Sequence, residues 1–199
     1  MSAQPTDGSS GAVVAAALAA ILDAFGAARA SEYLGESVTV ADHQLKTAAC
    51  ARAAGAAPAL IAAALLHDVG HVADHDSADA LRRGEDIRHE DTGSAWLARW
   101  FGPEVTEPVR LHVYAKRYLC AVDLGYYDTL SPISKKTLAM QGGPLEGAEL
   151  AAFQAGPYAQ DAANVRRWDD AGKDPDAVVP PLASYDELLA GLVRVPHAE

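Results

Sequence analysis

The sequence has little of what β-rich, disulfide-stabilised or nucleic-acid-binding proteins use. Aromatic residues make up only 7% of its 199 residues, and it has two cysteines and 16 basic residues against 27 acidic ones. Half of the chain is apolar, mostly through alanine and leucine, and this composition favours helices over strands. The formal net charge of −11 argues against a nucleic-acid partner. An anionic ligand would therefore need a local basic pocket.

Cysteine chemistry and a membrane span are also not indicated. Cys50 and Cys120 each lie in a helical apolar pattern without a CxxC partner, so we interpret both as small core residues. The alanine run from Ala12 to Ala20 follows no basic segment, and it is too short and too weakly apolar to span a membrane. We therefore expect a soluble, cytoplasmic protein with no membrane partner.

Helical patterns alternate with short breaks along the chain, with no convincing strand, repeat or domain linker. Residues 1–11 are rich in Ser, Gly, Pro and Asp, and we expect them to be a disordered tail. Residues 31–37, 73–88 and 123–132 are interpreted as connections. The remainder predicts one all-α domain over residues 12–199. Its helices are expected near residues 12–30, 39–54, 58–71, 89–102, 104–122, 133–140, 146–154, 157–171 and 185–193.

The stretch ALLHDVGHV, residues 64–72, places polar side chains at the end of an apolar helical run. A buried carboxylate beside a buried imidazole is costly unless something pairs with both. A metal ion is one such partner, so His67 and Asp68 are candidate metal ligands. His71 lies four residues after His67, which places both on one helix face unless Gly70 ends the helix. We interpret His71 as a pocket residue, although it can also be a ligand.

Four of the seven histidines belong to an ordered series with two carboxylates. The series is His43, His67 with Asp68, His89, His112, and then Asp169 or Asp170. So many core-side polar groups are hard to satisfy by hydrogen bonds in one small helical domain. Histidine and aspartate suit Fe, Mn, Zn or Ni, and no thiolate in the series favours a structural zinc. Six ligands exceed what one catalytic metal takes while keeping an open position, so two metals fit better. Asp68 has two oxygens and adjoins His67, which makes it the natural bridge.

Lys116 is a candidate for holding an anion. It follows His112 by four residues, so its ammonium points towards the same pocket as that histidine. A lysine within an otherwise apolar stretch of an acidic protein is suited to binding an anionic substrate. His75 and His197 lie in polar or terminal segments, and we expect both to be exposed.

The ordered histidines and the HDVGH motif resemble the HD-domain superfamily of metal-dependent proteins, most of which hydrolyse phosphate esters. Further motifs are similar to a narrower branch, the mixed-valent di-iron oxygenases of phosphonate breakdown. These motifs are YLGESVTVADHQLKTA, HEDTGSAWL, VRLHVYAKRYLCAVD, SPISKKTLAMQGGPL and RRWDD, within about residues 31–173. The resemblance implies a single HD-type helical bundle with an Fe(II)/Fe(III) pair. It also implies cleavage of the C–P bond of a 1-hydroxyphosphonate by O₂, giving a carboxylate and phosphate.

The resemblance also implies roles for the matched residues. Asp68 would bridge the irons, and Asp169 is preferred to Asp170 as the last ligand in the full set of His43, His67, Asp68, His89, His112 and Asp169. Tyr33 and Glu36 would form a lid over the open iron, and His71 would line the site. The phosphonate would be held by Lys116, Ser134, Gln141 and Arg166. The far end of the substrate stays open between an amino, a trimethylammonio and a hydroxymethyl type. An ammonium there would have Glu36, Asp123, Tyr126 and Tyr158 as candidate partners.

Three functions stay open at this stage. The first is an oxygenase acting on a substrate such as 2-amino-1-hydroxyethylphosphonate or its N-methylated analogue, with glycine or glycine betaine as product. The second is a phosphohydrolase that cleaves a small phosphate ester or nucleotide at Mn, Co or Ni. The third is a non-catalytic protein that binds a regulatory ligand. A C–P bond offers attacking water no good leaving group, which disfavours hydrolysis of a phosphonate. The proposed lid favours the oxygenase over a hydrolase, and the complete ligand set favours an enzyme over a non-catalytic protein.

Overall fold

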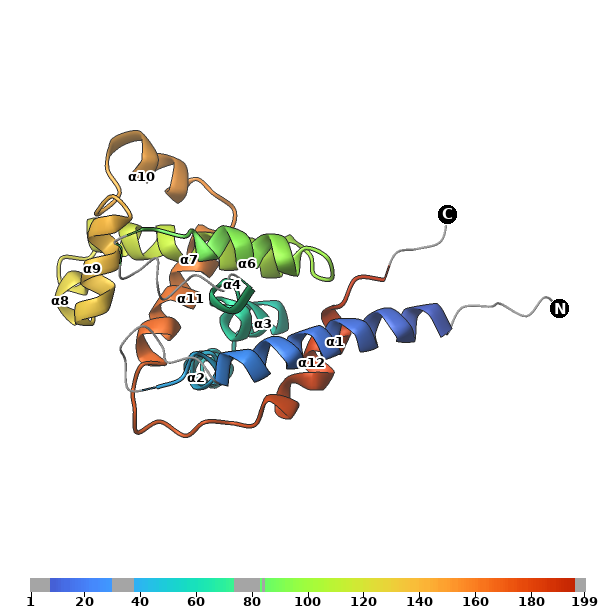
Figure 1. The fold of residues 1–199 in the computed structure, drawn as a ribbon. Coiled ribbons are helices and arrows are strands. Elements are labelled where there is room, and N and C mark those ends of the chain that lie inside the picture. Colours follow the sequence, from blue (N-terminus) through green and yellow to red (C-terminus); the bar gives the residue numbers. More distant parts are fainter. Residues whose placement is uncertain (1–7, 30–37, 74–82, 84, 196–199) are drawn as a thin grey trace.

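The computed structural model describes residues 8–29, 38–73, 83 and 85–195, and over these residues it contains helices and no β-strand (Figure 1). The expected all-α class is therefore confirmed. In chain order the helices are α1 (Gly8–Arg29), α2 (Val40–Ala53), α3 (Pro58–Leu66), α4 (Gly70–Ala73), α6 (His89–Leu97), α7 (Pro103–Val122), α8 (Tyr126–Thr129), α9 (Pro132–Met140), α10 (Gly147–Gln154), α11 (Ala159–Ala171), the 3₁₀ helix η1 (Leu182–Tyr185) and α12 (Asp186–Leu192).

The helix ends follow local chemistry that the sequence contains. The hydroxyl of Thr39 caps α2 by accepting a hydrogen bond of 3.1 Å from the backbone N–H of Asp42, and Ser131 caps α9 in the same way. Pro58 and Pro103 occupy the first turns of α3 and α7, where no backbone N–H is needed. Two short helices, α8 and η1, were not predicted, because elements of four residues have no measurable hydrophobic period.

Helix α1 differs from the sequence-based expectation in two ways. It begins at Gly8, inside the segment expected to be disordered, because extending an alanine-rich helix by one turn costs little free energy. The helix also runs past the alanine segment, and Ser10–Arg29 is long and apolar enough to cross a membrane by length and composition. The expectation concerned residues 12–20 alone, and the helix that contains them is longer. One face of α1, which includes Ile21 and Phe25, is buried in the core.

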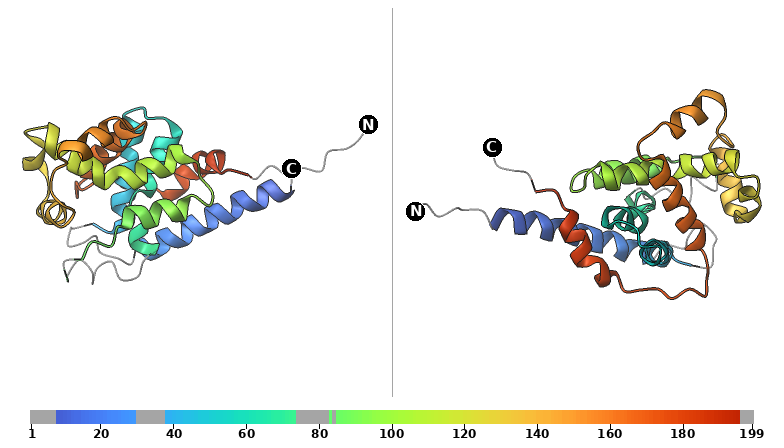
Figure 2. Two further views of the ribbon diagram at one scale, coloured as in Figure 1. Left: turned by 90° about the horizontal axis from the view of Figure 1, so that it is seen from above. Right: turned by 180° about the vertical axis from the view of Figure 1, so that it is seen from behind.

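The centre of the molecule is formed by α2, α3, α7 and α11, which pack on one another, with α6 against α7 and α4 against α6 (Figure 1). Helices α8, α9 and α10 gather at one end, away from the beginning of α1 (Figure 2). The main core is built from alanine and leucine with a few aromatic side chains such as Phe101 and Tyr185. Cys50 and Cys120 are free and only partly buried, so they lie at the edge of the apolar interior rather than inside it.

The predicted helix over residues 58–71 is interrupted just where the polar residues begin. Helix α3 ends at Leu66, and the next hydrogen bonds join residues three apart: Val69 N–H to Leu66 O at 3.1 Å and His71 N–H to Asp68 O at 3.0 Å. This 3₁₀-like tightening changes the angle between successive side chains. His67 and His71 therefore do not lie on one uninterrupted α-helix. The sequence analysis left such a break open at Gly70, and the structure places it earlier, after Leu66.

Helix α4 lies against α6 at van der Waals distance because of Gly70. A methyl group on Gly70 would lie 1.9 Å from the carbonyl oxygen of His89 and 2.9 Å from the backbone nitrogen of Gly93. Both neighbours are main-chain atoms, so neither can move aside as a flexible side chain would. The contact therefore fixes the distance between the Asp68 turn and the start of α6, where His89 lies.

Gly70→Ala should lower the free energy of unfolding by at least about 3 kcal/mol, because the added methyl overlaps the backbone of α6. Gly26→Ala is the matched control, since Gly26 lies inside α1 with nothing within 4 Å of its added methyl. That change should instead add about 1 kcal/mol through helix propensity. Chemical denaturation measures both. Equal stability of the two variants would contradict the close packing at Gly70.

Candidate metal centre

Six buried polar side chains from five parts of the chain meet between the central helices. None is more than 8% exposed, and they are His43 of α2, His67 and Asp68 after α3, His89 of α6, His112 of α7 and Asp169 of α11. These are the residues that the sequence analysis singled out as ligands. Residues more than a hundred positions apart thus converge on one point, which only the packing of the helices brings about.

The first set of donors surrounds one oxygen of Asp68. Oδ2 of Asp68 lies 3.2 Å from Nε2 of His67 and 3.7 Å from Nε2 of His43. The two imidazole nitrogens are 3.3 Å apart. Oδ1 of Asp169 completes the set, at 3.2 Å from His43 and 4.0 Å from His67. The ligand atoms of His43, His67 and Asp169 are close enough to hold one metal ion.

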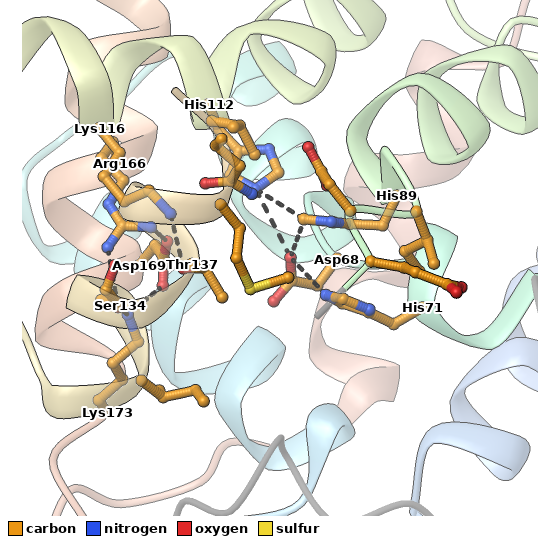
Figure 3. Close-up of a pocket in the computed structure, with 17 residues that line it drawn as sticks. Asp68, His71, His89, His112, Lys116, Ser134, Thr137, Arg166, Asp169 and Lys173 are labelled. Atoms are coloured by element: carbon orange, nitrogen blue, oxygen red, sulfur yellow. Dashed lines mark hydrogen bonds and ion pairs between the residues drawn. The ribbon is translucent and has the colours of Figure 1, made fainter. Parts of the chain in front are cut away.

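The second set surrounds the other oxygen of the same carboxylate. Oδ1 of Asp68 lies 3.3 Å from Nε2 of His89 and 3.6 Å from Nε2 of His112, and those two nitrogens are 3.2 Å apart (Figure 3). Nε2 of His71 is 3.9 Å from the same oxygen. Asp68, His71 and His89 form a second group with the geometry of a metal site. Asp68 therefore presents one oxygen to each of two ligand sets.

The imidazole rings are held with their metal-binding nitrogens turned inward. Nδ1 of His67 contacts the carbonyl oxygen of Ala64 at 2.9 Å, and Nδ1 of His112 contacts that of Val109 at 2.7 Å. A carbonyl only accepts, so each Nδ1 carries a proton, and Nε2 is the atom left to bind a metal. His89 has a carboxylate in this place, because Oε2 of Glu90 lies 3.5 Å from its Nδ1. Such partners orient ligand histidines in metal proteins.

The donor set fits a cation. Oδ2 of Asp68 is buried and accepts no hydrogen bond from any described residue, although Nε2 of His43 and Nε2 of His67 both face it. Burial would raise the pKa of Asp68, but His67 and His89 outweigh it and hold that pKa well below its usual value. In return Asp68 outweighs burial and raises the pKa of both histidines. Without a metal, protons must supply the positive charge that this cluster needs.

The choice between Asp169 and Asp170 has a clear geometric answer. Asp169 turns Oδ1 to the histidines, whereas Asp170 turns away and contacts Arg166, Tyr126 and Lys173. Burial would raise the pKa of Asp169, but Arg166 and Lys173 more than compensate and hold it well below its usual value. Consecutive residues on a helix point about 100° apart, so only one of them can face the centre.

His71 lies closer to the centre than a pocket-lining role requires. Its ring stacks on that of His89 with centroids 4.0 Å apart and an interplanar angle of 15°. Burial, together with the neighbouring His89, lowers the pKa of His71 to about 3, so its imidazole is neutral at physiological pH. The expected position in the pocket agrees with the structure, and its distance from Asp68 keeps a role as a ligand open.

A pocket opens from the second ligand set, and its far wall is cationic. Lys116, Arg166 and Lys173 lie together on one side of Asp68, whereas His71 and His89 lie on the other (Figure 3). Lys173 was missed by the sequence analysis. The available signal was its place four residues after Asp169 at the end of α11, which puts both on the same face.

The three cationic side chains differ in how many hydrogen bonds and ion pairs they make with other protein groups. Lys116 donates to Oγ1 of Thr137 at 2.9 Å. Lys173 donates to Oγ of Ser134 at 3.1 Å and pairs with both aspartates of α11. Arg166 is the most occupied, because its guanidinium contacts Asp169, Asp170, Tyr126 and Ser134.

Other predicted site residues have different outcomes. Ser134 and Gln141 line the pocket, and the buried Oε1 of Gln141 has no hydrogen-bond partner among the described residues. Tyr33, Glu36, His75 and His197 lie outside the described residues. Asp123 and Tyr158 are not among the residues that line this pocket, and Tyr126 turns its hydroxyl to Asp170, so the structure gives no ammonium contact to these three. Glu85, Asp86 and Ile87 also line the pocket.

Comparison with known proteins agrees with this arrangement. The HD domain family matches residues 40–139. The chain is 43% identical to the hydroxymethylphosphonate dioxygenase of Gimesia maris over an aligned region of 155 residues, and this region covers 77% of each chain. It is 41% identical over 162 residues to the [1-hydroxy-2-(trimethylamino)ethyl]phosphonate dioxygenase (glycine-betaine-forming) of Leisingera caerulea, which covers 81% of this chain and 83% of the relative. The chain therefore belongs to the HD-domain family and, within it, to the branch of oxygenases that these two relatives represent.

Proposed function

We propose that this protein is a di-iron oxygenase that uses O₂ to cleave the C–P bond of a 1-hydroxyphosphonate. The observation that carries the proposal is the shared carboxylate: Asp68 divides its oxygens between two ligand sets beside a cationic pocket. The names of the two relatives, both phosphonate dioxygenases, support the same reaction. Phosphonate is a doubly charged anion, and a pocket with three cationic side chains is suited to it.

The two ligand sets would hold two irons. His43, His67, Asp169 and Oδ2 of Asp68 would bind the first ion. The second would be bound by His89, His112 and Oδ1 of Asp68, with His71 beside it. Nitrogen and carboxylate donors without thiolates suit iron, and three or four protein ligands on each ion leave positions for substrate and O₂. An Fe(II)/Fe(III) pair would supply the one-electron chemistry that O₂ activation needs.

The reaction balances without an external reductant. A substrate R–CH(OH)–PO₃²⁻ and O₂ give R–COO⁻, HPO₄²⁻ and one proton, so the C–H and C–P bonds of the substrate supply all four electrons. The protein's own groups would bind and orient the phosphonate. Lys116 and Lys173 would supply positive charge, while Ser134 and Gln141 would add neutral hydrogen bonds. Arg166 would act mainly by holding the aspartates of α11.

Tyr33 and Glu36 keep their proposed role as a lid over the open iron. Tyr33 would cap the iron through its phenolic oxygen until substrate arrives, and Glu36 would lie on the same lid. The motif YLGE supplies both residues on a short segment directly before α2. A lid of this kind excludes water and delays O₂ activation until substrate is bound.

Iron-loaded protein should release phosphate from a 1-hydroxyphosphonate only when O₂ is present, with one O₂ consumed per phosphate. Hydroxymethylphosphonate and the 2-amino and 2-trimethylammonio analogues of 1-hydroxyethylphosphonate form the substrate panel, compared by kcat/KM. Phosphate release and an oxygen electrode measure the two quantities together. Oxygen-independent phosphate release from a phosphate ester would instead identify a hydrolase, and inactivity on the whole panel would contradict the proposal.

Substitution of the bridging carboxylate should remove more iron from the protein than substitution of a single histidine in either ligand set. His43→Ala removes a donor of the first set only and should leave close to one iron per chain, as should His89→Ala for the second set. Asp68→Ala should lose both irons, because each set then lacks its shared oxygen and faces unbalanced imidazoles. Metal analysis after reconstitution gives the stoichiometry. The exposed Asp186 of α12 supplies the control, Asp186→Ala, and full metal retention by Asp68→Ala would exclude the bridge.

Substrate binding should weaken as the pH rises through the pKa of Lys116. Burial and the nearby Arg166 and Lys173 together lower this pKa to about 7, against the opposing effect of Asp169 and Asp170. Lysine is cationic below its pKa, so an anion gains its full attraction below about pH 7 and loses it above. The KM should rise by up to about tenfold per pH unit on the alkaline side. Lys116→Arg stays charged and should flatten this rise.

Lys116→Ala separates the anion contact from the metal centre. It should raise KM by about tenfold or more through loss of a charged hydrogen-bond donor, while iron content stays at the wild-type level. Unchanged KM in Lys116→Ala, or the same pH profile in Lys116→Arg as in the wild type, would rule out this role for the ammonium.

A further inference from the structure

Tyr126 joins the small helix α8 to the charged residues of α11. Its side chain is 7% exposed. The hydroxyl accepts a hydrogen bond of 3.0 Å from Nε of Arg166 and donates one to Oδ2 of Asp170. The sequence separates Tyr126 from these partners by 40 and 44 residues. The contact therefore links two parts of the chain that only the tertiary structure brings together.

The phenol is suited to this double contact because it stays protonated. Burial raises the pKa of Tyr126 far above its usual value, and Asp170 raises it further against the opposing effect of Arg166. A neutral phenol has one proton to give and lone pairs to accept with. The proton goes to Oδ2 of Asp170, and a lone pair receives Nε–H of the guanidinium. Nε of Arg166 also lies 3.2 Å from the same Oδ2, so the phenol, the guanidinium and the carboxylate form one closed set of contacts.

The ring of Tyr126 is held firmly behind this hydroxyl. It packs in an apolar cluster with Leu119 of α7, with Leu130, which follows α8, and with Leu138 of α9. Rigid packing on three apolar side chains fixes the position of the oxygen, since rotation of the ring would open a gap in a close-packed cluster. The hydroxyl is therefore a fixed point against which a flexible arginine can be aligned.

Arg166 needs such a fixed point because it serves two places at once. Nη1 contacts Oδ2 of Asp169, the carboxylate whose other oxygen faces the histidines. Nη2 contacts Asp170 and lies 3.4 Å from Oγ of Ser134 in the anion pocket. A planar guanidinium holds all of these partners only in one orientation about its Nε.

We propose that Tyr126 is a positioning residue that acts through Arg166 and keeps the anion pocket preformed. The hydroxyl fixes Nε of Arg166, and the two terminal nitrogens then hold the aspartates of α11 and leave Ser134 and Lys173 turned to the pocket. Tyr126 does not line that pocket, so it acts without touching the anion. The inference rests on the proposed function in one respect, namely that an anion binds where Lys116 and Lys173 meet.

The first experiment compares two neighbouring tyrosines in the iron-loaded protein. Tyr126→Phe removes only the hydroxyl and keeps the packing of the ring. Tyr127→Phe is the matched control, because Tyr127 is 47% exposed and contacts Lys135 rather than α11. Inorganic phosphate is the probe, with its Kd measured by calorimetry. Tyr126→Phe should weaken phosphate binding by about tenfold, the effect of one hydrogen bond to a charged group, and Tyr127→Phe should leave Kd unchanged.

A double-mutant cycle separates positioning through Arg166 from a general structural effect. Arg166→Lys keeps the charge but has no Nε–H to meet the phenol. If Tyr126 acts through Arg166, Tyr126→Phe should weaken binding about tenfold in the wild-type background and have no further effect in Arg166→Lys. Equal effects of Tyr126→Phe in both backgrounds would overturn the proposal, as would wild-type affinity in the single variant.

Two further outcomes also decide against the proposal. If the Tyr126→Phe variant loses iron and phosphate-binding sites to the same extent, the hydroxyl supports the metal centre instead of the anion pocket. If iron-loaded wild type binds no phosphate, there is no preformed anion pocket for Tyr126 to maintain. Turnover of the hydroxyphosphonate panel, assayed on the same samples, tests the proposed function separately. Phosphate binding that depends on Tyr126 in a protein without oxygenase activity would support this inference and contradict that function.

Discussion

The structure depends on the burial of one carboxylate between two groups of imidazoles. Asp68 is 2% exposed, with Oδ2 facing His43 and His67 and Oδ1 facing His89 and His112. A buried charge of this kind is strongly destabilising unless positive charge balances it. The whole helical domain is arranged so that four separate helices, α2, α6, α7 and α11, bring their ligands to within 4 Å of one another or of this carboxylate. The metal centre and the core are therefore one structure.

Local backbone features place the carboxylate where both groups can reach it. The chain tightens after Leu66, which turns His67 to one side of Asp68 and His71 to the other. The missing side chain of Gly70 then lets α6 approach until His89 faces the second oxygen. On the opposite side, Asp169 is fixed between the histidines and Arg166. The same arginine contacts the pocket wall, so the metal centre and the cationic pocket share their supports.

Much of the fold and most of the site could be predicted from the sequence. Alanine-rich periodic segments, two of them starting at Thr39 and Pro58, predicted the main helices to within a few residues. The order of histidines and aspartates identified six residues that do converge. The short helices α8 and η1 escaped, because four residues contain too little periodic signal. The sequence did not locate the start of α1 or the break after Leu66, since helix extension and 3₁₀ tightening depend on neighbouring structure.

What the sequence by itself determined was the chemistry: which residue types are present, in what order, and on which helices. The sequence shows that no cysteine belongs to the ordered series of histidines and aspartates. It also shows that basic residues are scarce, so a lysine in an apolar stretch indicates an anion site. Only the tertiary structure decided how these groups are shared. It turned Asp169 rather than Asp170 to the histidines, gave Asp68 an oxygen for each set, and added Lys173 to the pocket. Periodicity along one helix gives directions about its own axis, whereas the angles and distances between helices follow from packing, which one-dimensional order does not contain.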